Sequence, residues 1–517
     1  MSILFSPEQQ RALDVYSRRA NLFITGPGGT GKSQFIKHIQ KQALLDGVGI
    51  QVCALTGCAA VLLECKARTV HSWAGIGIAS GTIEANVTKV MKSRMARETW
   101  RTAQVLVVDE ISMMSKKMFE MLDAIGKACR RNSLPFGGIQ LIFSGDFFQL
   151  PPVGDSGEPD TVRFCFESPL WSATFKPENH VQLTTMFRQT DPVYQKVLSQ
   201  IRCGRVTKSS NAILMAQVGK DYPSGLDFRP TKLFPTRNKV DSVNMCEITK
   251  LGGDELVYET VHRVDLEMTP SELRLRGQFT KTQIINELAY LQGNLRCGTT
   301  VRLKVGAQVM CIVNMELSNG ETLCNGSQGV VVGISSKGFP RVRYNSGPCV
   351  TMNPHGWNSE NIPGIGVEQV PLILAWALTI HKAQGATLDV AEIDAGAAIF
   401  ECGQTYVALS RVKSLDGLYL TSFDVTRVKI NRAVQDFYKN IDGYQLIAPR
   451  VHPPPPPQPP QVPQVPQVPQ VPQVAPISLE HIGSIGSIPM ADASVVSVPI
   501  DDNAPAMAVA VAVPLDV

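Results

Sequence analysis

The sequence contains no CxxC pair among its twelve cysteines, and no apolar run that approaches the roughly 20 residues of a membrane-spanning helix. Structural zinc sites and disulfide frameworks need cysteines at recognisable spacings, so we expect reduced thiols, no zinc and no membrane partner. A signal peptide is also missing, and Glu8 and Asp14 stand among the arginines near the start, which is untypical of a transit peptide. These absences predict an intracellular protein of the nucleus or the cytoplasm.

Basic residues are absent from the end of the chain. From Val451 onwards there is no Lys or Arg but there are five acidic residues, so residues 1–450 carry all 49 basic side chains and 40 of the 45 acidic ones. The resulting charge of +9 on this body suits a polyanionic partner, although many soluble enzymes are equally basic. Net charge alone therefore does not identify the partner.

Proline dominates the segment after Arg450. Pro453–Pro457 is followed by four QVP units from Gln461 to Pro472. Proline at every third position removes backbone donors and restricts φ, which prevents pairing into sheet or helix. We predict that residues 451–517 form a disordered, polyproline II-like tether and that the folded part ends near Arg450. Docking to a proline-binding protein module is the alternative role of this tail.

Before Arg450, short apolar runs alternate with helix-length amphipathic segments. With 517 residues, 44% of them hydrophobic, the chain is long enough for two to four domains of roughly 100–200 residues. Four apolar runs are too short and too β-rich for helices and are predicted as buried strands: Asn21–Thr25, Gln51–Thr56, Val105–Val108 and Gln140–Phe143. Apolar strands separated by helices indicate a parallel α/β sheet that is covered on both faces.

The pattern changes between Thr299 and Ser359. Segments such as Gln328–Val332 and Arg341–Tyr344, separated by Gly and Asn turns, predict a small antiparallel β insert. Alternating helix and strand patterns return at Val370–Ile380. We therefore predict that a second α/β unit is discontinuous in the sequence.

A glycine-rich segment follows the first predicted strand and opens a helix: Gly26, Pro27, Gly28, Gly29, Thr30, Gly31, Lys32 and Ser33. It matches GxxxxGK[ST], in which glycines allow backbone N–H groups to surround phosphates at a helix N-terminus. In this pattern Lys32 reaches the β- and γ-phosphates and the Ser33 hydroxyl holds Mg²⁺. The segment predicts a site for ATP and Mg²⁺.

Two adjacent acids, Asp109 and Glu110, end the predicted strand Val105–Val108. Placing two carboxylates at the end of a buried strand is costly unless their charges meet a partner. We expect Asp109 to hold Mg²⁺ and Glu110 to position and activate the attacking water. The pair therefore predicts nucleotide hydrolysis rather than transfer to a bound acceptor.

Eight segments, in this order along the chain, resemble those of superfamily 1B helicases of the petite-integration-frequency (Pif) type: Phe5–Gln10, Asp109–Met114, Pro135–Pro152, Phe187–Gln189, Leu303–Met310, Asn325–Gly326, Thr379–Gly385 and Tyr406–Val412. The resemblance spans Phe5 to Phe423. It implies a monomeric ATP-driven motor that translocates 5′-to-3′ on single-stranded DNA and unwinds duplex, forked or structured DNA. Such a motor would act in DNA repair, recombination, replication or telomere and genome maintenance.

The resemblance also implies roles at the nucleotide. Gln9 would read adenine, since an amide both donates and accepts. Gln149 would sense the γ-phosphate, and Gly385 would lie at the nucleotide. Arg188 and Arg411 resemble two arginines that the second motor domain contributes across the cleft, where a planar, permanently charged fork suits the charge on the transferring phosphoryl group.

Other matching positions would face the nucleic acid: Thr56, His71, Lys382, Gln384 and Tyr406. Hydroxyls and a lysine suit contacts to the strand backbone, which carry no base information. Two alternatives remain open from the sequence. His71 and its neighbour Trp73 can equally be core residues, and Gln384 with Gly385 can connect the DNA and ATP sites.

The fold implied by the resemblance is α/β, with two RecA-like P-loop motor domains. The first covers residues 1–185, with a strand-splitting wedge at about 75–92. The second covers residues 186–445 and is interrupted by a small β-barrel at about 299–360; the disordered tail of residues 451–517 follows. Two alternative functions are a RecD-like or relaxase-associated motor subunit, and a non-catalytic nucleic-acid scaffold recruited by its proline-rich tail.

Overall fold

The computed structural model describes residues 5–441, except positions 64, 78, 80, 156, 223–228, 265, 294, 296, 314, 318–321, 324–325, 345–346, 348 and 360–361. The tail predicted for residues 451–517 lies outside the described residues. Asn325, part of one of the matching segments, and two positions of the predicted wedge lie outside them as well.

The first α/β domain is built on a six-stranded sheet of order β3-β2-β4-β5-β1-β6, in which every neighbouring pair is parallel. Its strands are β1 (Leu22–Thr25), β2 (Ile50–Ala54), β3 (Arg68–Thr69), β4 (Val105–Asp109), β5 (Gln140–Gly145) and β6 (His180–Gln182). The four strands predicted from apolar runs are therefore confirmed to within two residues at each end.

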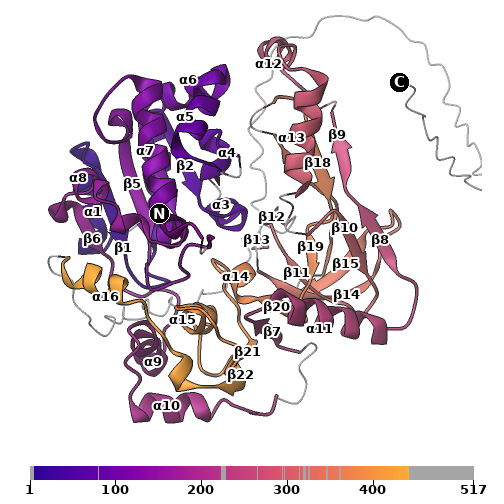
Figure 1. The fold of residues 1–517 in the computed structure, drawn as a ribbon. Helices are drawn as coiled ribbons and strands as arrows, with labels where there is room; N and C mark the ends of the chain where they lie inside the picture. Colours follow the sequence, from indigo (N-terminus) through magenta and orange to yellow (C-terminus); the bar gives the residue numbers. More distant parts are fainter. Residues whose placement is uncertain are drawn as a thin grey trace, which may run out of the picture. The chain divides into compact units, whose positions relative to one another are not determined.

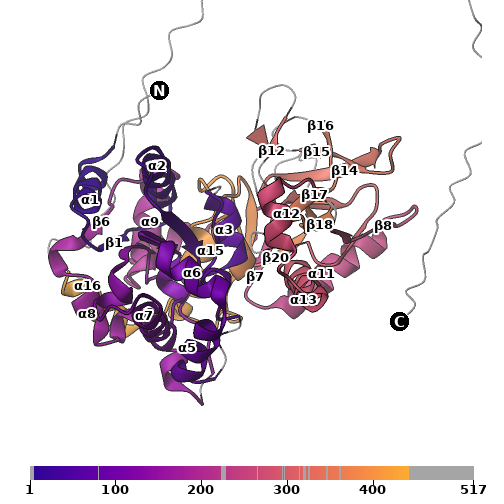
Figure 2. The ribbon, with the colours of Figure 1, turned by 90° about the horizontal axis from the view of Figure 1, so that it is seen from above.

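Helices cover both faces of this sheet, as Figure 2 shows for α1 and α2 on one side and α5 and α7 on the other. Alternate strand residues supply two separate cores: Leu22 and Val107 pack with the first helices of the chain, and Phe23 and Val108 pack with the later ones. The helices are α1 (Pro7–Ser17), α2 (Lys32–Leu45), α3 (Gly57–Leu63), α4 (Val70–Ala74), α5 (Ile83–Lys92), α6 (Arg94–Thr102), α7 (Lys116–Arg130) and α8 (Leu170–Thr174).

The second α/β domain has a four-stranded parallel sheet of order β20-β7-β21-β22. These strands are β7 (Thr231–Phe234), β20 (Ala377–Thr379), β21 (Ala391–Ala395) and β22 (Leu418–Phe423), and the helices are α9 (Pro192–Arg202), α10 (Lys208–Met215), α11 (Arg237–Lys250), α14 (Ile380–Ala383) and α15 (Gln404–Leu409). Because β7 pairs with β20 across a long stretch of sequence, this domain is discontinuous in the chain.

The stretch between these two strands forms a β-rich insertion, defined here as residues 256–374 and visible in Figure 1 as the group of strands from β8 to β19. A five-stranded sheet of order β16-β15-β14-β11-β19 is its largest element, and all of its pairs are antiparallel. β8 (Leu256–Glu259) pairs with β10 (Thr300–Leu303), and β9 (Val261–Arg263) pairs with β18 (Gly366–Gln369). Antiparallel structure therefore extends beyond the predicted 299–360 at both ends.

The remaining elements of the insertion complete its outline: α12 (Pro270–Arg276), α13 (Lys281–Gly293), β11 (Gln308–Cys311), β12 (Met315–Glu316), β13 (Thr322–Leu323), β14 (Gln328–Ile334), β15 (Pro340–Tyr344), β16 (Cys349–Thr351), β17 (His355–Asn358) and β19 (Leu372–Leu374). The early boundary was missed because β8 and β9 precede two helices and find their partners only far along the chain.

The last described helix, α16 (Arg432–Lys439), returns from the second domain to the first (Figure 1). Val434 and Tyr438 on this helix join the core that contains Phe23. The Tyr438 hydroxyl lies 2.6 Å from Thr25 Oγ1, at the end of β1. The chain thus crosses between the two α/β domains twice. Of the described helices, none has the length and apolar character needed to span a bilayer.

Candidate active site

The phosphate loop connects β1 to α2 and depends on glycine at positions where other residues would be strained. Gly26, Gly29 and Gly31 have φ values of 148°, 87° and 84°. A Cβ at Gly26 would lie 2.4 Å from Leu183 O. Lys32 Nζ points back into the loop, donating to Gly26 O (2.6 Å) and to a second loop carbonyl. Burial lowers the pKa of Lys32. The loop carbonyls therefore hold the ammonium where phosphate oxygens are predicted to bind.

The two predicted acids lie beside this loop. Asp109 is the last residue of β4, and Glu110 follows in the left-handed region with φ 55°. The Ser33 hydroxyl donates to Asp109 Oδ2 at 3.5 Å. Burial raises the pKa of both carboxyl groups, and for Glu110 the neighbouring Asp109 raises it further. Two carboxyl groups, buried at Asp109 and half-buried at Glu110, form with the nearby hydroxyl an all-oxygen set that suits Mg²⁺, whose charge would stabilise their ionised form.

Both predicted arginines reach the phosphate loop. A Cβ at Gly28 would lie 3.5 Å from Arg411 Nη2 and 3.8 Å from Arg188 Nη1. Arg411, 2% exposed, is held by the helix that precedes it, α15, since Nε donates to Val407 O at 2.8 Å. Burial and, secondarily, the Arg188 guanidinium lower the pKa of Arg411 to about 9. Two guanidinium groups crowded at one point create a strong preference for an anion between them.

Arg188 lies in the connection between the domains. The preceding residue, Phe187, donates its backbone N–H to Gly29 O at 2.9 Å, so this segment is attached to the phosphate loop. The Arg188 guanidinium donates to Ser410 O at 3.3 Å in the second domain. Arg188 therefore bridges both domains rather than belonging to the second one alone.

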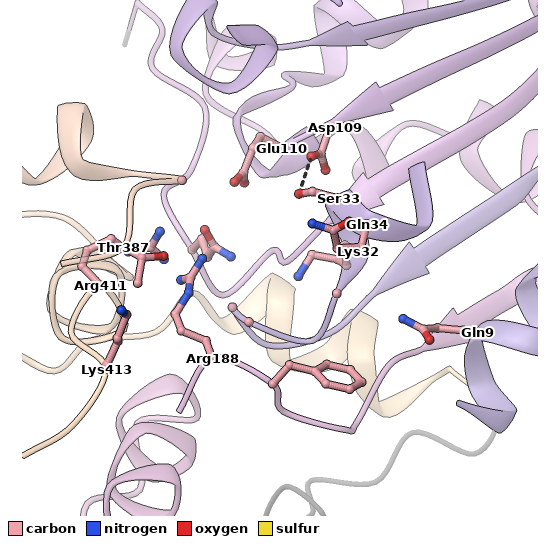
Figure 3. A pocket seen from close by; sticks show the side chains of 16 residues that line it. Gln9, Lys32, Ser33, Gln34, Asp109, Glu110, Arg188, Thr387, Arg411 and Lys413 are labelled. Atoms are coloured by element: carbon pink, nitrogen blue, oxygen red, sulfur yellow. Dashed lines mark hydrogen bonds between the residues drawn. The ribbon is translucent and has the colours of Figure 1, made fainter. Parts of the chain in front are cut away.

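These groups line one cavity of about 640 Å³ (Figure 3). Figure 3 shows Arg188, Arg411 and Lys413 facing Lys32 and the acids across the cavity, with Gln9 at its far end. Gln9 is positioned by the start of α1, where Ser6 N donates to Gln9 Oε1 at 3.0 Å and Ser6 Oγ accepts from Gln9 N. This capping box turns the amide Nε2 of Gln9 towards Gly31, where a Cβ would lie 2.9 Å from it.

Gln149 and Gln384 meet at the acid pair. Gln384 Nε2 donates to Glu110 Oε2 at 3.1 Å and to Gln149 Oε1 at 3.5 Å. Gln384 is 8% exposed, and Gly385 lines the same cavity. Gln384 therefore lies beside the acid pair, as the alternative of a link to the ATP site predicts, and its contact with nucleic acid stays a prediction.

Tyr406 was also predicted as a nucleic-acid contact, but its side chain is 3% exposed and lies inside the cleft. Its hydroxyl accepts a hydrogen bond from Gly28 N at 3.0 Å. α15 begins against the Phe148–Gln149 backbone, where a Cβ at Gly403 would lie 2.5 Å from Gln149 O. This packing turns Tyr406 towards the phosphate loop, and its contact with the nucleic-acid strand stays a prediction.

The other predicted strand contacts lie outside the cavity. Thr56 Oγ1 accepts from Ala59 N at 3.2 Å and begins α3, His71 is half-buried on α4, and Lys382 is exposed on α14. Burial lowers the pKa of His71. Trp73 is 1% exposed and packs on Trp100, so it belongs to the core. Next to these positions, Thr69 Oγ1 lies 3.3 Å from the Tyr290 hydroxyl of α13 in the insertion.

Gln189 is a site residue to which the sequence analysis assigned no role. It is 1% exposed, and its side-chain amide donates to Ser410 O (3.1 Å) and Val412 O (3.2 Å). These carbonyls flank Arg411, while the backbone of Gln189 follows Arg188. One amide therefore sets the spacing of the two arginines. Its position next to Arg188 in the Phe187–Gln189 segment is the one feature of the sequence that indicates a role at the site.

Comparison with known proteins adds independent information. Residues 5–216 match the family model described as PIF1-like helicase, and residues 294–334 match the one described as DNA helicase Pif1, 2B domain. The crystal structure of Pif1 helicase from Candida albicans is 33% identical, and the match covers 85% of this chain and 100% of that chain with a TM-score of 0.66. The chain belongs to the PIF1-like helicase family.

Two further relatives extend this family assignment. The ATP-dependent DNA helicase PIF1 of Emericella nidulans is 33% identical over 490 residues, which cover 83% of this chain and 62% of that protein. The chain thus spans less than two thirds of the length of this curated relative. A Bacteroides Pif1 helicase in complex with ADP-AlF3 and ssDNA is 27% identical, with coverage of 85% of this chain and 97% of that chain and a TM-score of 0.57. Membership of the PIF1-like family confirms the predicted α/β fold with a parallel sheet in its RecA-like core.

Proposed function

We propose that this chain is an ATP-dependent DNA helicase that hydrolyses ATP with Mg²⁺ between its two α/β domains. Hydrolysis would drive movement 5′-to-3′ on single-stranded DNA and separate duplex or forked DNA. The observation that carries it is the convergence of Arg188 and Arg411 on Gly28, in the cavity that also holds Lys32, Asp109 and Glu110.

The position of each side chain in the cavity indicates its role in ATP hydrolysis. The Lys32 ammonium would exchange its present partners, two loop carbonyls, for phosphate oxygens, which the N–H groups of the phosphate loop would also bind. Glu110, held by the Gln384 amide, would orient the attacking water. Ser33 and Asp109 would hold Mg²⁺, which supplies charge neutralisation at the phosphates. Arg188 and Arg411 would stabilise the charge that develops on the γ-phosphoryl group.

The base site of the same cavity would lie between Gln9 and Phe187. Phe187 is 46% exposed, and its ring lies 3.6 Å from the place of a Cβ on Gly31. An exposed aromatic ring beside an oriented amide suits a purine, with stacking on the ring and a hydrogen bond from Gln9 Nε2. This supports ATP as the nucleotide.

Domain closure would transmit hydrolysis to the strand. The second domain contacts the nucleotide site through Arg411, Gln384 and Tyr406, so losing the γ-phosphate changes contacts that join the two domains. Thr56, His71 and Lys382 are proposed strand contacts, and residues 75–92 are the proposed wedge. The Bacteroides relative bound to ssDNA supports single-stranded DNA as the partner. A monomeric motor, a nuclear or cytoplasmic location and a docking role for the proline-rich tail stay predictions from the sequence.

Hydrolysis is tested by replacing Lys32→Ala and measuring ATP turnover with and without single-stranded DNA. We expect DNA-stimulated hydrolysis to fall to the background level, while strand binding measured by fluorescence anisotropy is retained. Lys41→Ala, an exposed lysine on the same helix, is the matched control. Hydrolysis at the parent rate in Lys32→Ala would mean that the site assignment is wrong.

Direction and strand separation are tested on duplexes that carry a single 5′ or 3′ tail. We expect unwinding with ATP and a 5′ tail, and none with a 3′ tail. Translocation without unwinding would favour the RecD-like or relaxase-associated motor subunit. Strand binding without any hydrolysis would favour the non-catalytic scaffold.

A further inference from the structure

The Tyr406 hydroxyl occupies the position of a phosphate ligand. It accepts the hydrogen bond of Gly28 N at 3.0 Å, and Gly28 belongs to the loop whose N–H groups are expected to surround phosphates. Tyr406 reaches this amide from α15 in the second domain, through a ring that belongs to that domain's core. A group of one domain therefore satisfies, in this structure, an N–H of the other domain that nucleotide binding would require.

The phenolic proton of Tyr406 is directed to no protein acceptor in the part of the chain that the structure describes. Its only hydrogen bond among those residues is the one it accepts from Gly28. A buried hydroxyl normally both donates and accepts, because an unused donor in the interior costs free energy. Burial also raises the pKa of Tyr406, so the proton stays on the oxygen at neutral pH. The residue thus presents an unused, neutral donor to the cavity.

A second tyrosine of the same core shows the ordinary arrangement. Tyr194 on α9 is fully buried, and its hydroxyl donates to Leu409 O at 2.7 Å. Both rings pack in the core of the second domain, but only the Tyr406 hydroxyl faces the phosphate loop. Burial in this core therefore does not itself explain the missing acceptor of Tyr406.

The surroundings of Gly28 indicate which phosphate would supply that acceptor. Arg411 Nη2 and Arg188 Nη1 are the guanidinium atoms nearest to the place of a Cβ on Gly28, at 3.5 and 3.8 Å. Lys32 and Ser33, at the start of α2, are the expected partners of the β- and γ-phosphates and of the metal, and neither is a near neighbour of Gly28. Gly28 and its two arginines therefore lie at the outer end, where the terminal phosphate would sit.

We propose that the Tyr406 hydroxyl is a ligand of the terminal phosphate. It donates its proton to a γ-phosphate oxygen when a nucleoside triphosphate is bound, and returns to the Gly28 N–H when that phosphate has left. This inference rests on the proposed ATP hydrolysis. Tyr406 then contacts the nucleotide in the triphosphate state and not in the diphosphate state. Because Tyr406 lies on the second domain, this difference can change domain closure.

The test compares Tyr406→Phe with Tyr194→Phe, two substitutions that each remove one buried hydroxyl from the same core. Equilibrium binding of ADP, and of ADP with aluminium fluoride as a stand-in for the γ-phosphoryl group, is measured with Mg²⁺ for both variants and the parent. We expect Tyr406→Phe to weaken binding of the ADP–aluminium fluoride complex on the order of 10- to 100-fold, as the loss of one hydrogen bond to a charged acceptor predicts. Binding of ADP alone should change by less than about threefold, and Tyr194→Phe should change neither affinity beyond that range.

Equal weakening for ADP and for ADP–aluminium fluoride, or no weakening of either, would overturn the proposal. If Tyr406→Phe does not fold, 3-fluorotyrosine at position 406 of the otherwise unchanged chain replaces it. Its ¹⁹F resonance should shift with ADP–aluminium fluoride but not with ADP, and equal shifts contradict the inference. A parent protein that binds neither ligand refutes the proposed ATPase and this inference together. A parent that hydrolyses ATP while Tyr406→Phe binds both ligands like the parent refutes the inference alone.

Discussion

Arg202 and Asp146 form a bidentate ion pair that joins the two α/β domains in their shared interior. Arg202 Nη2 and Nε lie 2.7 and 2.8 Å from Asp146 Oδ1 and Oδ2, and the side chains are 5% and 0% exposed. Arg202 ends α9 of the second domain, and Asp146 directly follows β5 of the first. The guanidinium also lies 4.5 Å from the centre of the Phe148 ring. The segment that carries Gln149 to the nucleotide site is therefore anchored to the second domain.

Removing Arg202 should destabilise the protein strongly, because Asp146 would be left buried without a counter-charge. For Arg202→Ala we expect a loss of about 3–5 kcal/mol in the free energy of unfolding, measured by urea titration. Asp146→Asn combined with Arg202→Ala should recover part of that loss. The exposed neighbour Arg205→Ala is the control and should change stability by less than about 0.5 kcal/mol. A similar cost for Arg205→Ala and Arg202→Ala would contradict the interpretation.

Gln189→Leu should lower ATP turnover without weakening ADP binding. The substitution removes the amide that bonds to both carbonyls flanking Arg411, so the arginine spacing would relax. A displacement near 1 Å in a catalytic group costs on the order of 100-fold in rate. We expect kcat to fall by about 10- to 100-fold and the dissociation constant of ADP to stay within about twofold. An unchanged kcat would show that the arginines keep their positions without Gln189.

Gly137→Ala should destabilise the first domain. Gly137 has φ 68°, and an added Cβ would lie 2.4 Å from Gly126 O of α7. Left-handed strain and steric overlap together predict a cost of about 2–5 kcal/mol in unfolding free energy. Gly252→Ala, where nothing lies within 4 Å of an added Cβ, is the matched control. Thermal denaturation of both variants measures the difference, and equal melting temperatures would refute the packing argument.

His180 should make the first domain less stable in mild acid. Burial lowers its pKa from the ordinary 6.5 to about 4, among the rings of Phe23, Trp171 and Phe437. As the pH falls below 6.5 the unfolded chain takes up a proton that the folded protein takes up only near pH 4, so stability falls across this window. We expect this residue to account for about 2 kcal/mol between pH 7 and pH 5.

The measurement for His180 compares unfolding at pH 7 and pH 5 in the parent and in His180→Phe. The variant keeps an aromatic ring in the cluster but cannot titrate. Its stability should therefore fall less between the two pH values than that of the parent. The same fall in both proteins would exclude His180 as the source.

Much of the nucleotide site could be predicted from contiguous sequence. The residues from Gly26 to Ser33, and Asp109 with Glu110, lie directly after β1 and β4, and parallel strands of one sheet end at the same edge. Predicting the strands is therefore enough to predict that these residues lie close together. Gln384 and Tyr406 were expected at the nucleic acid, whereas their side chains meet Glu110 and Gly28 in this structure. Contiguous sequence could not indicate these two contacts, because each joins residues of different domains.

The sequence by itself determined the apolar runs that become strands, the glycines that shape the phosphate loop and the acids at the end of β4, because each is a property of neighbouring residues. Only the tertiary structure decided that Tyr406 meets Gly28, that Arg202 pairs with Asp146 and that β8 pairs with β10. Those pairings join residues far apart in the chain. They form only when complete domains and sheets pack together. Burying a polar group costs free energy unless it has a partner, so the packed structure decides which polar groups pair.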